Sequence, residues 1–383
     1  MNRETKNITE SELTSWRLLK DFRKLFSGVL KDRPHSKSED DPRRKLHYLD
    51  YATSILFVFC NPVISSMRGL CAASQLKKVK KYATTRHLSL GSFSEAQHIF
   101  DAGALQELVC KLAAKITPAK LKKKDILPAV KDLVAVDGSL FQTLSRVFWA
   151  DWQDDKHKAA KLHLGFSVMK KTAVNAIITA GNSCERKALL QMVEEGVMYV
   201  CDRYYGLDYA FFEVMDQLGA LFTIRIRNNP KLTVLEDYEL TKEDRKEGVI
   251  SDQLVRLGDP DRNLPPVRLV KTNAFGGKEI LLVCSEPPER ISAALVSLIY
   301  RQRWQIEVFF KWLKSLLGCR KLLAESPEGV AMQMYCALIA AILMYDHFGK
   351  IPTKRQMEML QFYFMEFASY EELEEAFAEN KKG

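Results

Sequence analysis

Apolar residues recur at helical spacing along the first third of the chain. Between Ser11 and Leu30 they follow one face of a helix: Leu13, Trp16, Leu19, Phe22, Leu25 and Phe26. The same spacing predicts helices over three further ranges: 46–59, 63–75 and 105–116. Ser92 and Glu95 match a capping box, which predicts the start of another helix. We therefore predict a helical region over residues 1–125.

From Lys131 the pattern changes to short apolar and β-branched runs that end at turn residues. Five such runs predict strands: 132–137, 161–169, 173–180, 197–202 and 221–227. The second and third strands would form a hairpin over residues 170–172. Helices are predicted over 185–195 and 209–218. Three consecutive strands followed by helix–strand alternation favour an α/β fold with a mixed sheet.

A third pattern follows, in which strand-like pieces are split by turns rich in glycine, proline and asparagine. It predicts a small β-rich insertion over residues 228–288. The rest of the chain reads as helices, including an apolar one over 330–345. The predicted organisation has four parts: residues 1–125; 126–227 with 289–345; 228–288; and 346–383.

Composition and charge indicate the class of protein and partner. Hydrophobic residues make up 47% of the 383 residues and charged residues 27%, which is typical of a globular protein. The net charge of +9 favours a polyanionic partner, nucleic acid before a membrane. Two basic clusters suit phosphate contacts: Lys77, Lys78, Lys80 and Lys81 with Arg86, and Lys115, Lys120, Lys122, Lys123 and Lys124. Each cluster is equally compatible with a solvated helix face.

The eight cysteines are scattered without close Cys/His spacing, which disfavours a zinc site or a disulfide scaffold. The polar N-terminus lacks the apolar core of a signal peptide. The apolar runs 49–60 and 330–345 are shorter than the roughly 20 residues that a membrane span needs, so they predict buried helices. We expect a cytoplasmic protein.

The segment 299–320 is the one around which the chain is organised, and it is predicted to be a single amphipathic helix. At about 100° per residue, five polar or aromatic residues fall within roughly 80° of one another: Tyr300, Arg303, Glu307, Lys311 and Lys314. Apolar residues occupy the opposite face: Ile306, Phe309, Phe310, Leu313, Leu316 and Leu317. Ion pairs between Arg303, Glu307 and Lys311 would be an equally good explanation of the polar face taken alone.

Two aspartates stand at the ends of predicted strands. Asp137 ends the first strand before Gly138 and Ser139, and Asp202 ends the fourth. Either could serve only as a turn-former or cap. Together with Glu307, however, they supply the carboxylate oxygens that Mg²⁺ prefers.

These motifs resemble one group of bacterial insertion-sequence transposases. The spacing of Tyr300, Arg303, Glu307 and Lys314 is similar to its tyrosine–arginine–glutamate–lysine signature, VDGS at 136–139 to its first aspartate motif, and CDRYYG at 201–206 to its second. Tyr204 stands where the family commonly has glycine, so the sequence of that loop departs from the family pattern. The resemblance covers roughly residues 125–345. It implies a ribonuclease H-like catalytic core with a β-rich insertion, preceded by a helical DNA-binding domain.

The resemblance also implies the chemistry. Asp137, Asp202 and Glu307 would bind two Mg²⁺ or Mn²⁺ ions, which promote phosphodiester displacement. The DNA-binding residues would be Tyr300, Arg303, Trp304, Lys311 and Lys314. The partners would be the terminal inverted repeats of a transposon and target double-stranded DNA, bound by a homodimer in the bacterial cytoplasm near the nucleoid. The enzyme would cut at transposon ends and join the exposed 3′-OH to target DNA by transesterification, and a hairpin step is compatible with this scheme.

Three other interpretations remain open at this point. The chain could be a catalytically inactive DNA-binding relative, although binding alone does not need three clustered acids. It could be a stand-alone metal-dependent nuclease with the same core. It could also be a recombinase with Tyr204, Tyr205 or Tyr300 as a covalent nucleophile, but no activating Arg/His cluster lies beside them in the sequence.

Overall fold

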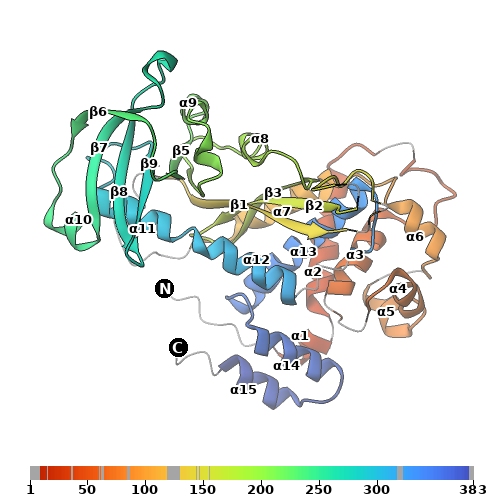
Figure 1. Ribbon diagram of the computed structural model, residues 1–383. Coiled ribbons are helices and arrows are strands. Elements are labelled where there is room, and N and C mark those ends of the chain that lie inside the picture. Colours follow the sequence, from red (N-terminus) through yellow and green to blue (C-terminus); the bar gives the residue numbers. More distant parts are fainter. Residues whose placement is uncertain are drawn as a thin grey trace.

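The chain folds around one large mixed sheet with helices on both faces, which confirms the predicted α/β class (Figure 1). The computed structural model describes the following residues: 9–14, 16–35, 38–59, 61, 64–83, 87–118, 130–143, 145, 147–154, 156–316 and 322–378. Arg86, Lys120, Lys122, Lys123 and Lys124 of the two basic clusters lie outside these ranges.

Nine strands form the sheet in the order β3-β2-β1-β4-β5-β9-β8-β7-β6. Their bounds are β1 Leu133–Gln142, β2 Ala159–Ser167, β3 Thr172–Ala180, β4 Met198–Cys201, β5 Leu221–Ile226, β6 Leu232–Asp237, β7 Val249–Leu257, β8 Val267–Phe275 and β9 Lys278–Cys284. β4 runs parallel to β1 and β5, and all other neighbouring strands are antiparallel. The first five strands have the order and directions of a ribonuclease H-like sheet, as the resemblance implied.

The two faces of the sheet carry different helices (Figure 1). On one face lie α7 (Gly103–Lys115), α11 (Ala293–Arg301), α12 (Trp304–Leu316) and α13 (Pro327–Phe348). On the other lie α8 (Glu185–Leu190) and α9 (Ala210–Gln217). Because side chains alternate along a strand, each face has its own apolar core.

The N-terminal helices share the first of these cores with the sheet. They are α1 (Glu10–Thr14), α2 (Arg17–Lys31), α3 (Tyr48–Phe59), α4 (Met67–Ala73), α5 (Lys77–Tyr82) and α6 (Leu90–Ala96). Phe22, Phe26 and Tyr51 are buried in the same cluster as Leu133 of β1. The predicted capping box at Ser92 is wrong, because α6 starts earlier and Ser92 N–H donates to the cap Ser89 at 3.1 Å.

One helix of the described residues, α13, is long and apolar enough to cross a membrane by length and composition. Its apolar residues are instead buried within the fold, where it packs on α3, α7 and β3. The predicted buried helix is therefore confirmed. After it come α14 (Lys354–Phe364) and α15 (Tyr370–Ala378), which pack on each other.

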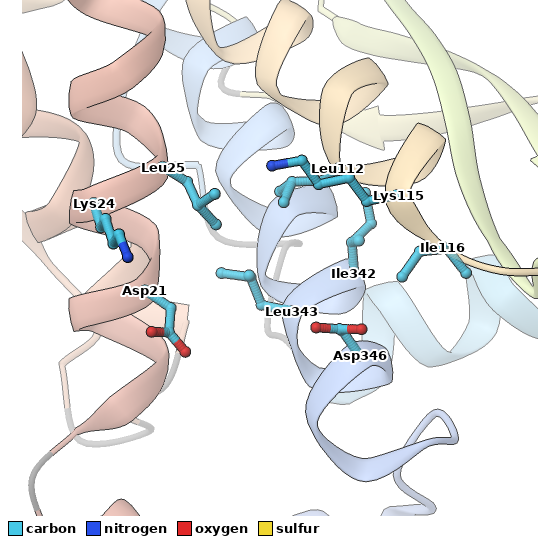
Figure 2. A pocket seen from close by; sticks show the side chains of 9 residues that line it. All are labelled: Asp21, Lys24, Leu25, Leu112, Lys115, Ile116, Ile342, Leu343 and Asp346. Carbon is cyan, nitrogen blue, oxygen red and sulfur yellow. The ribbon is translucent and has the colours of Figure 1, made fainter. Parts of the chain in front are cut away.

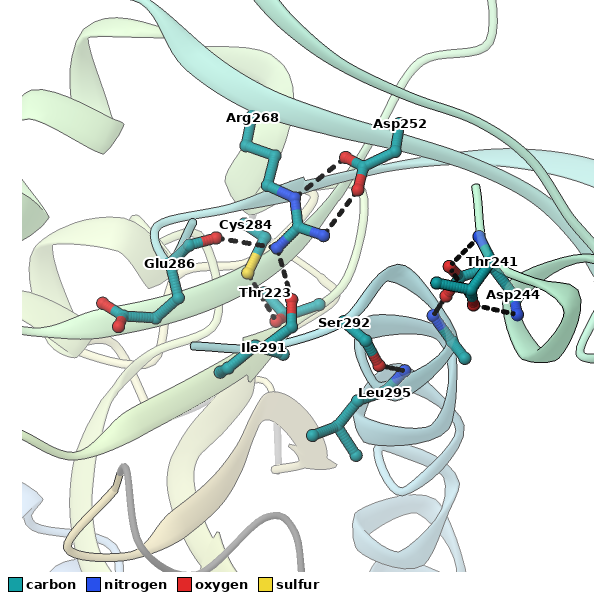
Figure 3. Close-up of polar contacts among 11 residues, drawn as sticks. Thr223, Thr241, Asp244, Asp252, Arg268, Cys284, Glu286, Ile291, Ser292 and Leu295 are labelled. Carbon is teal, nitrogen blue, oxygen red and sulfur yellow. Dashed lines mark hydrogen bonds and ion pairs between the residues drawn. The ribbon is translucent and has the colours of Figure 1, made fainter. Parts of the chain in front are cut away.

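The predicted β-rich insertion extends the main sheet, because β9 pairs with β5. It also holds the start of α11 (Figure 3). Arg268 on β8 donates to both carboxylate oxygens of Asp252, at 2.8 and 2.6 Å, and to the carbonyls of Glu286 and Ile291, at 2.9 and 2.6 Å. Asp244 of the short helix α10 (Lys242–Lys246) accepts from Ala294 N–H at 2.7 Å.

Two predictions about the site-bearing elements are wrong. The segment 299–320 was predicted to be a single helix, but its described part belongs to two helices. The backbone N–H groups of Gln302 and Arg303 donate to the carbonyls three residues earlier, those of Ile299 and Tyr300, and this tighter turn separates α11 from α12. Residues 317–320 lie outside the described ranges. Asp137 does not end its strand, because Gly138 and Ser139 still pair with β2 and the strand continues to Gln142.

Candidate active site

Asp137 lies on β1, and Asp202 is the first residue after the adjacent parallel strand β4. Ala135 of β1 is in register with Val200 of β4, and each aspartate stands two residues further on. Alternation therefore directs both side chains to the face that carries α11 and α12. Asp137 Oδ1 accepts from Gly138 N–H and Asp202 Oδ1 from Tyr204 N–H, both at 2.8 Å.

The charge of the Asp137 carboxyl is only partly compensated. Burial raises its pKa to about 7, and the neighbouring Asp202 charge adds to the effect, while the Gly138 N–H and Arg303 oppose it. Like charges so close together favour a bound cation. The donor set consists of carboxylate oxygens, which fits a hard divalent ion such as Mg²⁺.

Arg303 joins this pair to Glu307. Its Nη2 donates to Glu307 Oε1 at 2.5 Å, and its Nη1 lies 3.8 Å from Asp137 Oδ2. Within the described part of the chain, no three Asp, Glu, His or Cys side chains lie close enough to hold a metal ion. A divalent cation would therefore compete with the Arg303 guanidinium for Asp137 and Glu307.

Beside Arg303 lie a phenol and a second arginine. Tyr300 is buried, and burial raises the pKa of its hydroxyl, while the positive charges of Arg303 and Arg225 act in the opposite direction. Arg225 lies on β5, and its buried Nε has no hydrogen-bond partner among the described residues. Our sequence reasoning missed Arg225, although its position in the strand LFTIRI shares the face of Thr223 and Leu221.

The other predicted DNA-binding residues lie along α12. Trp304 is 54% exposed, and the Lys311 ammonium lies 4.7 Å from its ring centroid. The Lys314 ammonium lies 4.9 Å from the ring of Phe141. The opposite face is apolar as predicted, and its described side chains are buried: Ile306, Phe309, Phe310 and Leu313.

A fourth carboxylate, Glu185, stands next to this site. It is the first residue of α8, the helix that follows β3, and its side chain lies against Gly138. A Cβ atom on Gly138 would lie only 2.8 Å from Glu185 Oε1. Our sequence reasoning read Gly138 as a turn residue and missed Glu185. The available signal was an acid at the first position of a helix predicted to follow the third strand.

A cavity of about 260 Å³ lies elsewhere, between α2, α7 and α13 (Figure 2). Its lining mixes two acids and two lysines with apolar side chains: Asp21, Asp346, Lys24, Lys115, Leu25, Leu112, Ile116, Ile342 and Leu343. None of the predicted site residues lines it, so it is separate from the carboxylates.

Known proteins are similar to this chain over part or most of its length. A Sinorhizobium fredii protein, named as a transposase, y4zB, is 30% identical to this chain over 156 residues. The match covers 40% of this chain and 43% of that protein. A Synechocystis sp. protein, named as a transposase for insertion sequence element IS4SA, is 23% identical over 67% of this chain and 71% of its own length. The solved synaptic complex of piggyBac transposase with hairpin DNA is 12% identical with a TM-score of 0.42, and covers 98% of this chain and 86% of its own.

The first of these relatives is thus matched over less than half of its own length. The family model described as "Transposase DDE domain" matches residues 128–343, more than half of the chain and all of the elements that carry the carboxylates and Arg303. The chain therefore belongs to the family of transposase DDE domains.

Proposed function

We propose that this protein is a DNA transposase that cuts at the ends of an insertion sequence and joins the 3′-OH to target DNA. The proposal rests on one observation above all. Within a domain of the transposase family, register pairing brings Asp137 beside Asp202, and Arg303 connects Asp137 to Glu307. Such a group of acids suits phosphodiester chemistry with bound divalent cations.

Asp137, Asp202 and Glu307 would hold Mg²⁺ or Mn²⁺, with two ions in each site. The bound ions would activate the attacking oxygen and stabilise the leaving oxygen. Arg303 would exchange its carboxylate partners for a phosphate, which its planar donor fork fits well. Arg225, whose buried Nε has no hydrogen-bond partner among the described residues, and Tyr300 would contact the same phosphate.

The DNA partners would be the terminal inverted repeats and a target duplex, bound by a homodimer. Lys311 and Lys314 would contact backbone phosphates, which give affinity without sequence specificity. Trp304, exposed at the edge of α12, would stack on an unpaired base. The spacing of Tyr300, Arg303, Glu307 and Lys314 supports the tyrosine–arginine–glutamate–lysine group of insertion-sequence transposases.

The test is strand cleavage and joining on a duplex that carries the ends of the element, with Mg²⁺ present. Asp137→Asn, Asp202→Asn and Glu307→Gln should each lower the cleavage rate at least about a thousandfold, as expected for loss of a group that stabilises the transition state. Glu213→Gln changes the same charge on the exposed face of α9 and should leave the rate unchanged. Cleavage that persists in the three variants would refute the assignment of the site. Cleavage without joining would indicate a nuclease, and DNA binding without cleavage an inactive relative.

A further inference from the structure

Glu185 reaches the acidic centre from the face of the sheet opposite to Glu307. It begins α8, which lies against β1 and β2, whereas Glu307 lies on α12, which packs on the other face of β1. Gly138 has no side chain, and the Glu185 carboxylate fills the space that a Cβ atom would take. The backbone of β1 beside Asp137 is therefore in direct contact with Glu185.

Glu185 and Asp202 act on each other through their charges. Burial raises the pKa of Glu185, the Asp202 charge adds to that effect, and the Lys161 charge opposes it. The Glu185 charge in turn adds to the raised pKa of Asp137. Lys161 Nζ lies 3.4 Å from Glu185 Oε1, but it also donates to the Ser183 carbonyl at 3.0 Å. Lys161 pairs with Glu185 on the α8 side, and Arg303 pairs with Asp137 and Glu307 on the α12 side. Among the ion pairs of the described residues, two cations thus serve these three acids and Asp202, which leaves negative charge in excess around β1.

A buried hydroxyl points to a ligand in the same place. Tyr205, in the turn after Asp202, is wholly buried, and its hydroxyl lies beside the Glu185 carboxylate. That oxygen nevertheless completes no hydrogen bond of good geometry among the described residues. The charges of Glu185, Asp137 and Asp202 all act on it. A buried hydroxyl left without a partner among carboxylates indicates a position for a bound water or ion.

We propose that Glu185 is a fourth carboxylate of the cation site that Asp137 and Asp202 would form, and that it raises the affinity of this site for hard divalent cations. This inference rests on the proposed function. The Tyr205 hydroxyl and Glu185 would together hold the water shell of the ion on the α8 side. Groups in this position orient the directly bound ligands and strengthen binding.

A purely structural role for Glu185 makes a different prediction. If Glu185 only neutralises Lys161 and favours the positive end of α8, then removing either partner should lower stability and leave cation affinity alone. If Glu185 serves the cation site, the two partners should act in opposite directions. Loss of Glu185 removes an attraction for the cation, and loss of Lys161 removes a repulsion.

The experiment measures Mn²⁺ binding to the purified full chain without DNA, by the electron paramagnetic resonance signal of free Mn²⁺. Glu185→Gln should weaken binding about tenfold, the lower end of the effect of groups that orient metal ligands. Lys161→Met should raise the affinity for Mn²⁺. The control variant Glu213→Gln should bind Mn²⁺ with the same affinity as the unchanged chain. Circular dichroism of each variant checks the fold. Equal affinity in Glu185→Gln and the unchanged chain would refute the inference, and so would weaker binding in a folded Lys161→Met.

Asp137→Asn separates this inference from the function on which it rests. If Asp137→Asn abolishes Mn²⁺ binding and Glu185→Gln does not change it, only the role of Glu185 is refuted. If Asp137→Asn leaves Mn²⁺ binding unchanged, the cation site itself is refuted, and the role of Glu185 with it.

Discussion

Two arginines form ion pairs with carboxylates near α11. Arg268 does so where α11 begins, and Arg303 does so between α11 and α12, but the two ion pairs differ in burial and geometry. Arg268 and Asp252 each expose only 4% of their side chains, and their two hydrogen bonds are parallel and short. Arg303 is 18% exposed and divides its guanidinium between Glu307 and the more distant Asp137. Arg268 also donates to two backbone carbonyls, whereas Arg303 contacts carboxylates to which a cation could bind instead.

The surroundings of both arginines contain buried polar atoms without a hydrogen-bond partner among the described residues: His163 Nδ1, Tyr205 Oη and Arg225 Nε near the predicted metal-binding acids, and Ser297 Oγ on α11. The two regions differ in what each arginine holds. The Arg268 network fixes where α11 begins, and the Arg303 network leaves its partners exchangeable.

Arg268→Ala should destabilise the protein far more than Arg303→Ala. Removal of one partner from a buried ion pair leaves an uncompensated charge and costs about 3–5 kcal/mol. A partly exposed pair such as Arg303 with Glu307 contributes about 1 kcal/mol or less. Urea unfolding of both variants at pH 7 measures the two free energies. Equal losses would show that the two arginines do not differ in the way described.

The double variant Arg268→Met with Asp252→Leu is the control for that prediction. Apolar residues of similar volume often replace a buried ion pair at little cost. We expect the double variant to recover most of the lost stability. Failure to recover would assign the loss to the contacts with the Glu286 and Ile291 carbonyls instead.

His163 should make the stability of the protein depend on pH. Burial, with a smaller contribution from the Lys161 charge, lowers its pKa to about 4. A folded-state pKa below the unfolded value favours the neutral ring, so the stabilisation is present above about pH 6.5 and is lost as the pH falls toward 4. The loss attributable to His163 is at most about 3 kcal/mol.

Urea unfolding at pH 7 and at pH 4.5 measures this loss, with His163→Gln as the comparison. The variant should lose less stability than the unchanged chain between the two pH values, whatever its stability at pH 7. An equal loss in both proteins would mean that His163 does not control this part of the pH dependence.

Much of the fold followed from the sequence because its local patterns are strong. The hairpin of β2 and β3 and the buried helix α13 lie close to the predicted ranges, and strands β6 to β9 lie within the insertion predicted over residues 228–288. Errors arose where pairing between distant segments overrides local preference. Gly138 favours a turn in isolation, but the whole length of β2 holds it within β1.

The candidate active site was likewise predicted only in part from the sequence. A resemblance in motifs suggested Asp137, Asp202 and Glu307, and their roles remain predictions. No pattern in the sequence placed Arg303 between Asp137 and Glu307, because that contact needs α12 to cross β1. Glu185 and Arg225 escaped attention for a similar reason. Each is an ordinary residue of its own element and becomes notable only through its neighbours in space.

Gly138→Ala should change the free energy of unfolding least of these variants, and whether it lowers or raises that free energy should depend on Glu185. In the unchanged chain the new Cβ atom would meet the Glu185 carboxylate at 2.8 Å, and such overpacking costs about 1–2 kcal/mol. In a Glu185→Ala background that clash is absent, and alanine in place of glycine within a strand should gain about 0.5 kcal/mol. Urea unfolding of the two single variants and the double variant gives the coupling between the positions. If Gly138→Ala costs the same in both backgrounds, the Glu185 side chain does not lie against β1. The acidic centre would then be open on the α8 side, and only the α12 side would hold exchangeable charges.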